Sequence, residues 1–285
     1  MKACRVAFFA MGDRNHFQML APVISGVADR GAEAFVFTDQ QLTTEVERAG
    51  AKFVDLYAKH PLEEADEESI PHPCRYVSFA GSFAQEVAGE VEALGAQLIV
   101  YETFSVVAWV VGRLLSLPYV NVGVGHNIAP ARYLPRLESD PRVDLSPRCL
   151  RAVELLRERY AIADASPFAY ISGISPFLNL HPEPPAFLDP DERRAFEPIA
   201  FFGSLPAVDE IEARRGEARS SPFGDGAHDT KLYVSFGTIV WRYWKAEALD
   251  ALMRISDAVA KTRGLCALIG LGGAQLGADV IAELA

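Results

Sequence analysis

Two acid–base side chains of this 285-residue sequence stand at positions where they could do chemistry together. His16 follows a short apolar run and opens a helical pattern, and Glu102 ends another apolar run. An imidazole can act as a general base, and a carboxylate beside it can fix its tautomer and stabilise the imidazolium. Two plainer interpretations compete with this one: a histidine that only lines a helix end, and a solvated carboxylate that caps a helix near Ser105.

The local pattern around His16 predicts its charge state. We expect Asn15 to be the N-cap of the helix that contains His16. Because the N-terminal end of a helix disfavours a positive charge, this position predicts a neutral imidazole, which suits a general base.

Two other segments have residue types that bind ligands. The run from Tyr233 to Thr238 is typical of a strand that ends in a Gly-Thr turn. Gly237 would allow backbone N–H groups to approach a phosphate, and the Thr238 hydroxyl could donate to it, although an ordinary strand-to-helix turn explains the same residues. His126 and Asn127 follow a later strand and are candidate pocket residues.

Several familiar fingerprints are absent from the sequence. The run Gly270-Leu-Gly-Gly273 follows a strand, but Gln275 occupies the third glycine position of a dinucleotide-binding loop. The remaining histidines have no metal-ligand spacing, so we expect no metal site. The sequence also contains neither a GxSxG motif nor a P-loop.

Apolar runs alternate with helical patterns through the first half of the chain. The expected strands are 5–9, 34–38, 52–56, 97–101 and 119–122, and the expected helices are 17–28, 45–49, 76–94 and 106–115. This alternation predicts an α/β fold with a parallel sheet covered on both faces. Right-handed crossovers then place the loops after the strands, and with them His16 and Glu102, at one ligand-binding edge.

The rest of the chain predicts a second domain. Residues 58–73 and 123–147 are expected to be long irregular loops with a functional role. Residues 206–230 are rich in charge, Gly, Ser and Pro, which indicates a linker after a domain at 1–205. Strands at 231–236 and 265–270, with helices at 245–261 and 278–284, then begin a domain at 231–285 that has too few elements to cover both faces of a sheet. We therefore expect a chain truncated at its C-terminal end.

Composition excludes several classes of protein. Lys plus Arg number 27 and Asp plus Glu 38, which gives a net charge of −11. Such a chain is a poor candidate for binding nucleic acid or an anionic membrane. No apolar run is long enough to insert stably into a bilayer, the N-terminus does not read as a signal peptide, and the four cysteines are far apart, so we expect a cytoplasmic protein.

Four segments, in order, resemble a known family. The stretch from Asn15-His16 to Arg30-Gly31 resembles the GHxxP…RG pattern of GT-B nucleotide-sugar glycosyltransferases, in the group that includes macrolide and plant UDP-glycosyltransferases. Residues 98–102 with Gly112-Arg113 resemble its VVYD…G segment, 201–206 its FVGP segment, and 233–238 its VSFGT segment. Asn15 replaces the motif glycine, Met19 the proline and Glu102 the aspartate, and the late His-Cys-Gly or His-His-Gly donor motif is absent.

The resemblance implies a GT-B fold with a Rossmann-like acceptor domain and the start of a Rossmann-like donor domain. It implies an inverting glycosyltransferase that moves a sugar from a nucleotide-sugar, a UDP-sugar in this group, to a hydroxyl of a small lipophilic acceptor such as a macrolide or terpenoid. It implies no metal and no cofactor besides the donor. His16 would be the general base and Glu102 its partner.

The same resemblance places Gly237 and Thr238 near the donor diphosphate. We also expect Phe17, His126 and Asn127 to line the acceptor pocket. Because the donor motif is missing, we expect the chain alone to be inactive. A non-catalytic acceptor-binding fragment is therefore one alternative function, and an NAD-dependent oxidoreductase, weakened by the failed glycine fingerprints, is another.

Overall fold

The computed structural model describes residues 3–62, 74–123, 128–202, 223, 229–237, 240–241, 244–272 and 274–284. The chain divides into two compact units, Met1–Glu212 and Ala213–Ala285. Most of the segment 206–230, expected to be a linker, lies outside the described residues.

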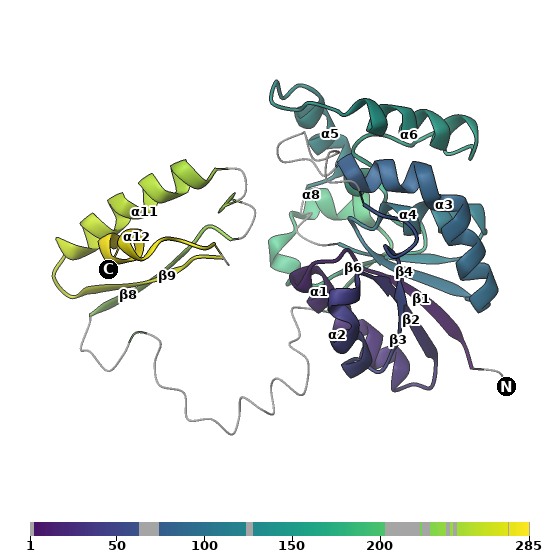
Figure 1. The fold of residues 1–285 in the computed structure, drawn as a ribbon, viewed down its shortest axis with the longest axis horizontal. Helices are drawn as coiled ribbons and strands as arrows, with labels where there is room; N and C mark the ends of the chain where they lie inside the picture. Colours follow the sequence, from purple (N-terminus) through teal and green to yellow (C-terminus); the bar gives the residue numbers. More distant parts are fainter. Residues whose placement is uncertain are drawn as a thin grey trace. The chain divides into compact units, whose positions relative to one another are not determined.

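The first unit is built on a seven-stranded parallel sheet with the order β3-β2-β1-β4-β5-β6-β7 (Figure 1). Its strands are β1 (Arg5–Phe9), β2 (Glu33–Thr38), β3 (Lys52–Asp55), β4 (Leu98–Glu102), β5 (Tyr119–Val122), β6 (Leu178–His181) and β7 (Ile199–Phe201). The first five lie within one residue of the predicted runs, and every pairing is parallel. The predicted α/β architecture is therefore confirmed.

Alternate residues of the central strand β1 bury opposite faces of the sheet. Val6 and Phe8 pack in a cluster with the helices α1 (Arg14–Ala28) and α2 (Thr43–Arg48). Ala7 and Phe9 belong to a second cluster, to which three helices contribute most of the helical side chains. Those helices are α3 (Cys74–Leu94), α4 (Val106–Leu114) and α6 (Pro147–Glu158). Both faces of the sheet are thus covered, which explains why its strands are almost continuously apolar.

The start of α1 differs from the sequence prediction. Its N-cap is Asp13, not Asn15: the Asp13 carboxylate accepts hydrogen bonds from the backbone N–H groups of Asn15 (2.8 Å) and His16 (3.4 Å). Asp and Asn cap helices about equally well. The backbone decides between them, because Asp13 is extended (φ −117°, ψ 131°) whereas Asn15 is already helical. At the other end, Gly31 has a φ of +84°, a conformation that favours glycine after a helix.

The segment 123–147 is not irregular throughout, which corrects a second expectation. It contains α5 (Pro130–Glu138), and α6 begins at its last residue. Pro130 and Pro147 both occupy the first helical position, where the missing N–H would have no partner in any case. Both prolines therefore start helices within a segment that was expected to be a loop.

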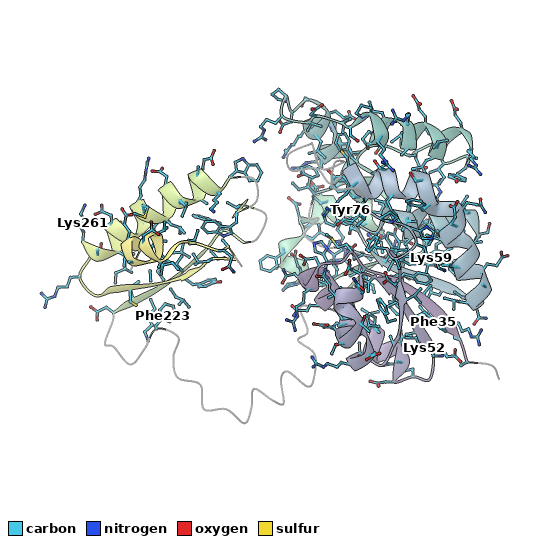
Figure 2. All side chains as sticks on the ribbon, in the orientation of Figure 1. Phe35, Lys52, Lys59, Tyr76, Phe223 and Lys261 are labelled. Carbon is cyan, nitrogen blue, oxygen red and sulfur yellow. The ribbon has the colours of Figure 1, made fainter. Side chains whose placement is uncertain are left out.

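Charged side chains protect one edge of the sheet. On the outer strand β3, Lys52 extends over the ring of Phe35, with Nζ 4.9 Å from the ring centre, and reaches Glu33 (Figure 2). Such a lysine opposes pairing with another chain. Short helical turns complete the unit: η1 (Gln40–Leu42), α7 (Ala169–Ser172), η3 (Pro185–Phe187), α8 (Pro190–Arg193) and η4 (Arg194–Phe196).

The second unit contains the elements predicted for it, each within one residue of its expected bounds. They are β8 (Thr230–Ser235), α11 (Lys245–Ala260), β9 (Leu265–Gly270) and α12 (Ala278–Leu284). The strands β8 and β9 pair in parallel, and Trp241, Ala248 and Leu252 form a small core. Two parallel strands joined through a helix are the repeating element of a Rossmann-like fold.

Candidate active site

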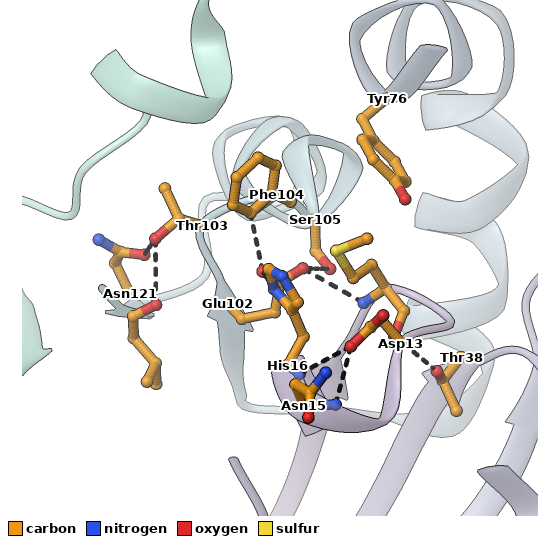
Figure 3. A network of polar contacts seen from close by, with 12 residues as sticks. Asp13, Asn15, His16, Thr38, Tyr76, Glu102, Thr103, Phe104, Ser105 and Asn121 are labelled. Atoms are coloured by element: carbon orange, nitrogen blue, oxygen red, sulfur yellow. Dashed lines mark hydrogen bonds and ion pairs between the residues drawn. The ribbon is translucent and has the colours of Figure 1, made fainter. Parts of the chain in front are cut away.

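The sheet brings the two predicted acid–base residues together. Strands β1 and β4 are parallel neighbours, so the loop after β1 and the end of β4 meet at the same edge. His16 lies in the first turn of α1, which follows β1, and Glu102 is the last residue of β4. The His16 Nδ1 atom lies 3.1 Å from Glu102 Oε2, within hydrogen-bonding distance (Figure 3).

Glu102 is fixed from three directions. Its side chain is fully buried, and Oε1 accepts hydrogen bonds from the Met11 backbone N–H (3.2 Å) and the Ser105 hydroxyl (2.8 Å). Oε2 accepts a third from the Phe104 backbone N–H (3.0 Å) as well as facing His16. The carboxylate therefore links the loop after β1 to the start of α4. It is not the solvated cap that the alternative interpretation required.

The surroundings of His16 reverse the expected direction of its pKa. Burial, the largest influence, lowers the pKa of His16, as does the helix N-terminus in principle. The hydrogen bond to Glu102 and the negative charges of Glu102 and Asp13 oppose this and prevail, so the pKa is raised above the ordinary value of 6.5. The prediction of a pKa held low by the helix terminus is wrong, because it took account of neither carboxylate.

The geometry assigns different tasks to the two ring nitrogens. With Nδ1 directed at a buried carboxylate, the neutral ring carries its proton on Nδ1 and its lone pair on Nε2. The side chain of His16 is 19% exposed, so solvent can reach the ring. Such an imidazole can take a proton at Nε2 while Glu102 stabilises the resulting positive charge.

Aromatic rings adjoin the dyad. The ring of Phe104 meets His16 edge to face, with centres 5.1 Å apart, and stacks on Tyr170 at 5.5 Å. Tyr76 approaches Phe104 from another side at 6.4 Å (Figure 3). Burial raises the pKa of Tyr76 to about 12, so its hydroxyl stays protonated at neutral pH. The histidine thus lies beside a largely apolar, uncharged surface.

A buried polar ladder, which sequence reasoning missed, supports the turn after Glu102. The hydroxyl of Thr103 donates to the carbonyl of Val122 on β5 (3.1 Å). On the same strand, Asn121 donates to the amide oxygen of Asn179 on β6 (3.3 Å). Asparagine within two otherwise apolar strands was the available indication, because such a side chain is buried only with a hydrogen-bonding partner.

Of the other predicted site residues, the structure describes Phe17 and Gly237. Phe17 is only 2% exposed and packs in the core that holds α1 on the sheet. Gly237 follows β8 with a φ of +72°, and its N–H donates to the Ser235 hydroxyl. His126, Asn127 and Thr238 lie outside the described residues.

Among the described side chains, no group of three or more His, Cys, Asp or Glu is placed to hold a metal ion. In the same part of the chain, no helix is both long and apolar enough to cross a membrane.

The fold has close counterparts among solved structures, although no protein-family model and no curated protein sequence matches the chain. The calicheamicin glycosyltransferase CalG4 is 17% identical, with a TM-score of 0.65 over 99% of this chain and 67% of its own. The glycotransferase of kitacinnamycin is 15% identical, with a TM-score of 0.65 over 97% of this chain and 68% of its own.

The spinosyn rhamnosyltransferase SpnG complexed with spinosyn aglycone is 17% identical, with a TM-score of 0.52 over 93% of this chain and 64% of its own. The chain therefore spans about two thirds of the length of these structures. The fold is that of the GT-B glycosyltransferases, as the four sequence segments indicated.

Proposed function

We propose that this chain belongs to an inverting glycosyltransferase that transfers a sugar from a nucleotide-sugar to a hydroxyl of a small lipophilic acceptor. The observation that carries the proposal is the His16–Glu102 dyad at the edge of a parallel sheet of GT-B type, with Nδ1 and Oε2 3.1 Å apart. The GT-B fold supports this reaction class, whereas an NAD-dependent oxidoreductase has no glycine fingerprint in its favour.

In this proposal His16 is the general base. Its Nε2 takes the proton from the acceptor hydroxyl as that oxygen forms a bond to the anomeric carbon of the sugar. The bond from the anomeric carbon to the nucleoside diphosphate breaks in the same step, and the diphosphate leaves with the electron pair, which inverts the anomeric centre. Glu102 holds Nδ1–H and stabilises the imidazolium, and the raised pKa of His16 supports a base that retains the proton it takes.

The aromatic surface beside His16 supports a lipophilic acceptor. Phe104 is partly exposed and lies against His16, while Tyr76 and Tyr170 are buried behind it. Apolar contact with such rings orients an aglycone without charged groups. A spinosyn aglycone is the ligand of one SpnG structure, which favours an acceptor of this general kind.

We assign the donor to the second unit, with Gly237 and Thr238 near its diphosphate. Gly237 supports the assignment, since its positive φ disfavours other residues and its lack of a side chain leaves the backbone after β8 open to a phosphate. Thymidine diphosphate is the ligand of another SpnG structure. We therefore propose a nucleoside diphosphate sugar as donor, with UDP-sugars as the first candidates and TDP-sugars as the second.

The test compares His16→Ala with the parent in the full-length protein that contains this chain, using UDP- and TDP-sugars and a panel of aglycones. General-base catalysis contributes roughly 10²–10⁴-fold, so kcat should fall by that factor while acceptor binding persists. Gln18→Ala, on the exposed side of the same helix, is the matched control. A loss of less than about tenfold in His16→Ala would show that this residue is not the base. Acceptor binding without transfer from any donor would favour the acceptor-binding module instead.

A further inference from the structure

Glu192 is a buried acid that the proposed mechanism does not use. It lies in α8 and is only 3% exposed. Its Oε2 atom accepts a hydrogen bond from the backbone N–H of Ala129, and its Oε1 atom forms an ion pair with the guanidinium of Arg132. Ala129 is the N-cap of α5, and Arg132 lies in the first turn of that helix. A carboxylate from one short helix therefore holds the start of another.

The start of α5 has little within its own sequence to fix it. The N-cap, Ala129, has no side-chain oxygen that could accept a hydrogen bond. In a capping box, the third helical residue is a Glu or Gln that accepts from the N-cap N–H, but in α5 this residue is Arg132. Pro135 also removes one N–H from the helix interior. Glu192 takes the place of the missing acid, and its negative charge suits the N-terminal end of a helix.

The contact joins the segments that follow two neighbouring strands. Strands β5 and β6 are parallel neighbours, α5 follows β5, and α8 follows β6. Both helices therefore come after the carboxyl ends of their strands, and Glu102 stands at the same edge of the sheet as the last residue of β4. Glu192 links the segments after β5 and β6, as Glu102 links those after β1 and β4.

From its anchored start, α5 leads to the aromatic surface beside His16. Tyr133, the residue after Arg132, packs against the buried cluster that contains Tyr170. Burial raises the pKa of Tyr170, and Tyr133 adds to the rise, which indicates that the two hydroxyl groups are near one another. Tyr170 stacks on the ring of Phe104, with centres 5.5 Å apart, and Phe104 lies against His16. A continuous series of contacts thus runs from α5 to the proposed base.

We propose that Glu192 is a positioning residue for the acceptor. By fixing the start of α5 it holds Tyr133 and Tyr170 in place, and through them the ring of Phe104 against which the aglycone lies. This role rests on the proposed function, since it needs an acceptor at that surface. The Glu192 carboxylate faces α5 and not His16, so we expect it to affect the affinity for the acceptor and not the chemical step.

The experiment compares Glu192→Gln with the parent in the full-length protein, using the donors and the aglycone panel of the His16→Ala test. The amide can still accept from the Ala129 N–H, but it places no negative charge opposite Arg132. We expect the KM for the aglycone to rise about two- to tenfold, the factor that one aromatic pair contributes, with kcat and the donor KM unchanged. Asp191→Asn, which alters the exposed neighbouring acid of α8, is the matched control and should change none of these values.

The split between the kinetic constants separates a positioning role from a structural one. If Glu192 only stabilised the fold, Glu192→Gln would have a lower Tm and the aglycone KM of the parent, and that result would overturn the proposal. Arg132→Gln is the milder variant, because its side chain is 58% exposed. It should raise the aglycone KM in the same direction, and it decides the question if Glu192→Gln does not fold.

Binding measurements distinguish failure of this role from failure of the proposed function. Calorimetry of the same variants without a donor gives the Kd of the aglycone. If the parent binds aglycones but transfers no sugar, glycosyl transfer is wrong, and the Kd of Glu192→Gln still tests the positioning role. If the parent transfers sugar and the variants keep its KM and Kd, only the positioning role is wrong. A parent that binds no aglycone would refute both.

Discussion

The substitution Glu102→Gln tests the dyad through its hydrogen bonds. It keeps the size of the side chain and replaces one carboxylate oxygen by an NH₂ group. Four donors face the carboxylate: the Met11 N–H and the Ser105 hydroxyl at one oxygen, and the Phe104 N–H and His16 Nδ1 at the other. An amide can accept at only one of these two positions.

The expected loss of stability follows from that count. Whichever way the amide turns, its NH₂ group faces the backbone N–H of either Met11 or Phe104, and a backbone N–H cannot become an acceptor. Leaving one buried donor unsatisfied costs about 1–3 kcal/mol of unfolding free energy. In a unit of roughly 200 residues this lowers the Tm by about 2–12 °C.

The chemical consequence concerns His16. Loss of the negative charge removes the main influences that raise its pKa, so that pKa should fall. If the NH₂ group faces Nδ1, the neutral ring must place its proton on Nε2, and the lone pair needed by a base is lost. In the full-length enzyme we expect kcat to fall by roughly 10²–10⁴-fold.

The assay combines thermal unfolding with an NMR titration of the His16 ring. Glu33→Gln is the control, because Glu33 is a more exposed acid whose partners Arg5 and Lys52 lie at the surface, where such pairs contribute about 0–1 kcal/mol. If Glu102→Gln has the same Tm as Glu33→Gln and leaves the His16 titration unchanged, the network does not hold the histidine as described.

Two further predictions concern packing and pH. Gly81→Ala should destabilise the fold by about 1–3 kcal/mol, because the new Cβ collides with Ala152. Gly89→Ala in the same helix should stabilise the fold by up to about 1 kcal/mol, because nothing lies within 4 Å of its new Cβ. Urea unfolding of both variants measures these changes, and equal effects would contradict the close crossing of α3 and α6. Because the pKa of His16 is raised in the folded protein, the protonated ring stabilises the fold fully below pH 6.5, and this stabilisation is lost as the pH rises through the higher folded-state pKa. Unfolding free energies measured from pH 5.5 to about 8.5 should therefore fall more steeply for the parent than for His16→Gln, and parallel curves would refute the raised pKa.

Much of the first unit could be predicted because its strands are buried on both faces. Runs such as Arg5–Phe9 are apolar at nearly every position, and the alternation with helices determines a parallel sheet. The meeting of His16 and Glu102 followed from the same topology, since both lie just after or at the ends of neighbouring strands.

The features that the sequence could not predict depend on residues far apart in the chain or on a choice between two equally suitable residues. The pKa of His16 depends on Glu102, 86 residues away. Asp13 and Asn15 are equally good caps, and only the backbone around Asp13 decides between them. The contact of Glu192 with the start of α5 joins residues 63 positions apart, which no local pattern in the sequence records.

The position of Glu102 has a consequence for reading related sequences. Its carboxylate joins the loop after β1 to the start of α4 as well as facing the histidine, so the acid stabilises the fold whether or not the reaction occurs. In a lineage that abandoned catalysis, His16 would be free to vary while selection for stability would still retain an acid at position 102. An acidic residue there is therefore a marker of ancestry, and only the histidine is a marker of a working enzyme.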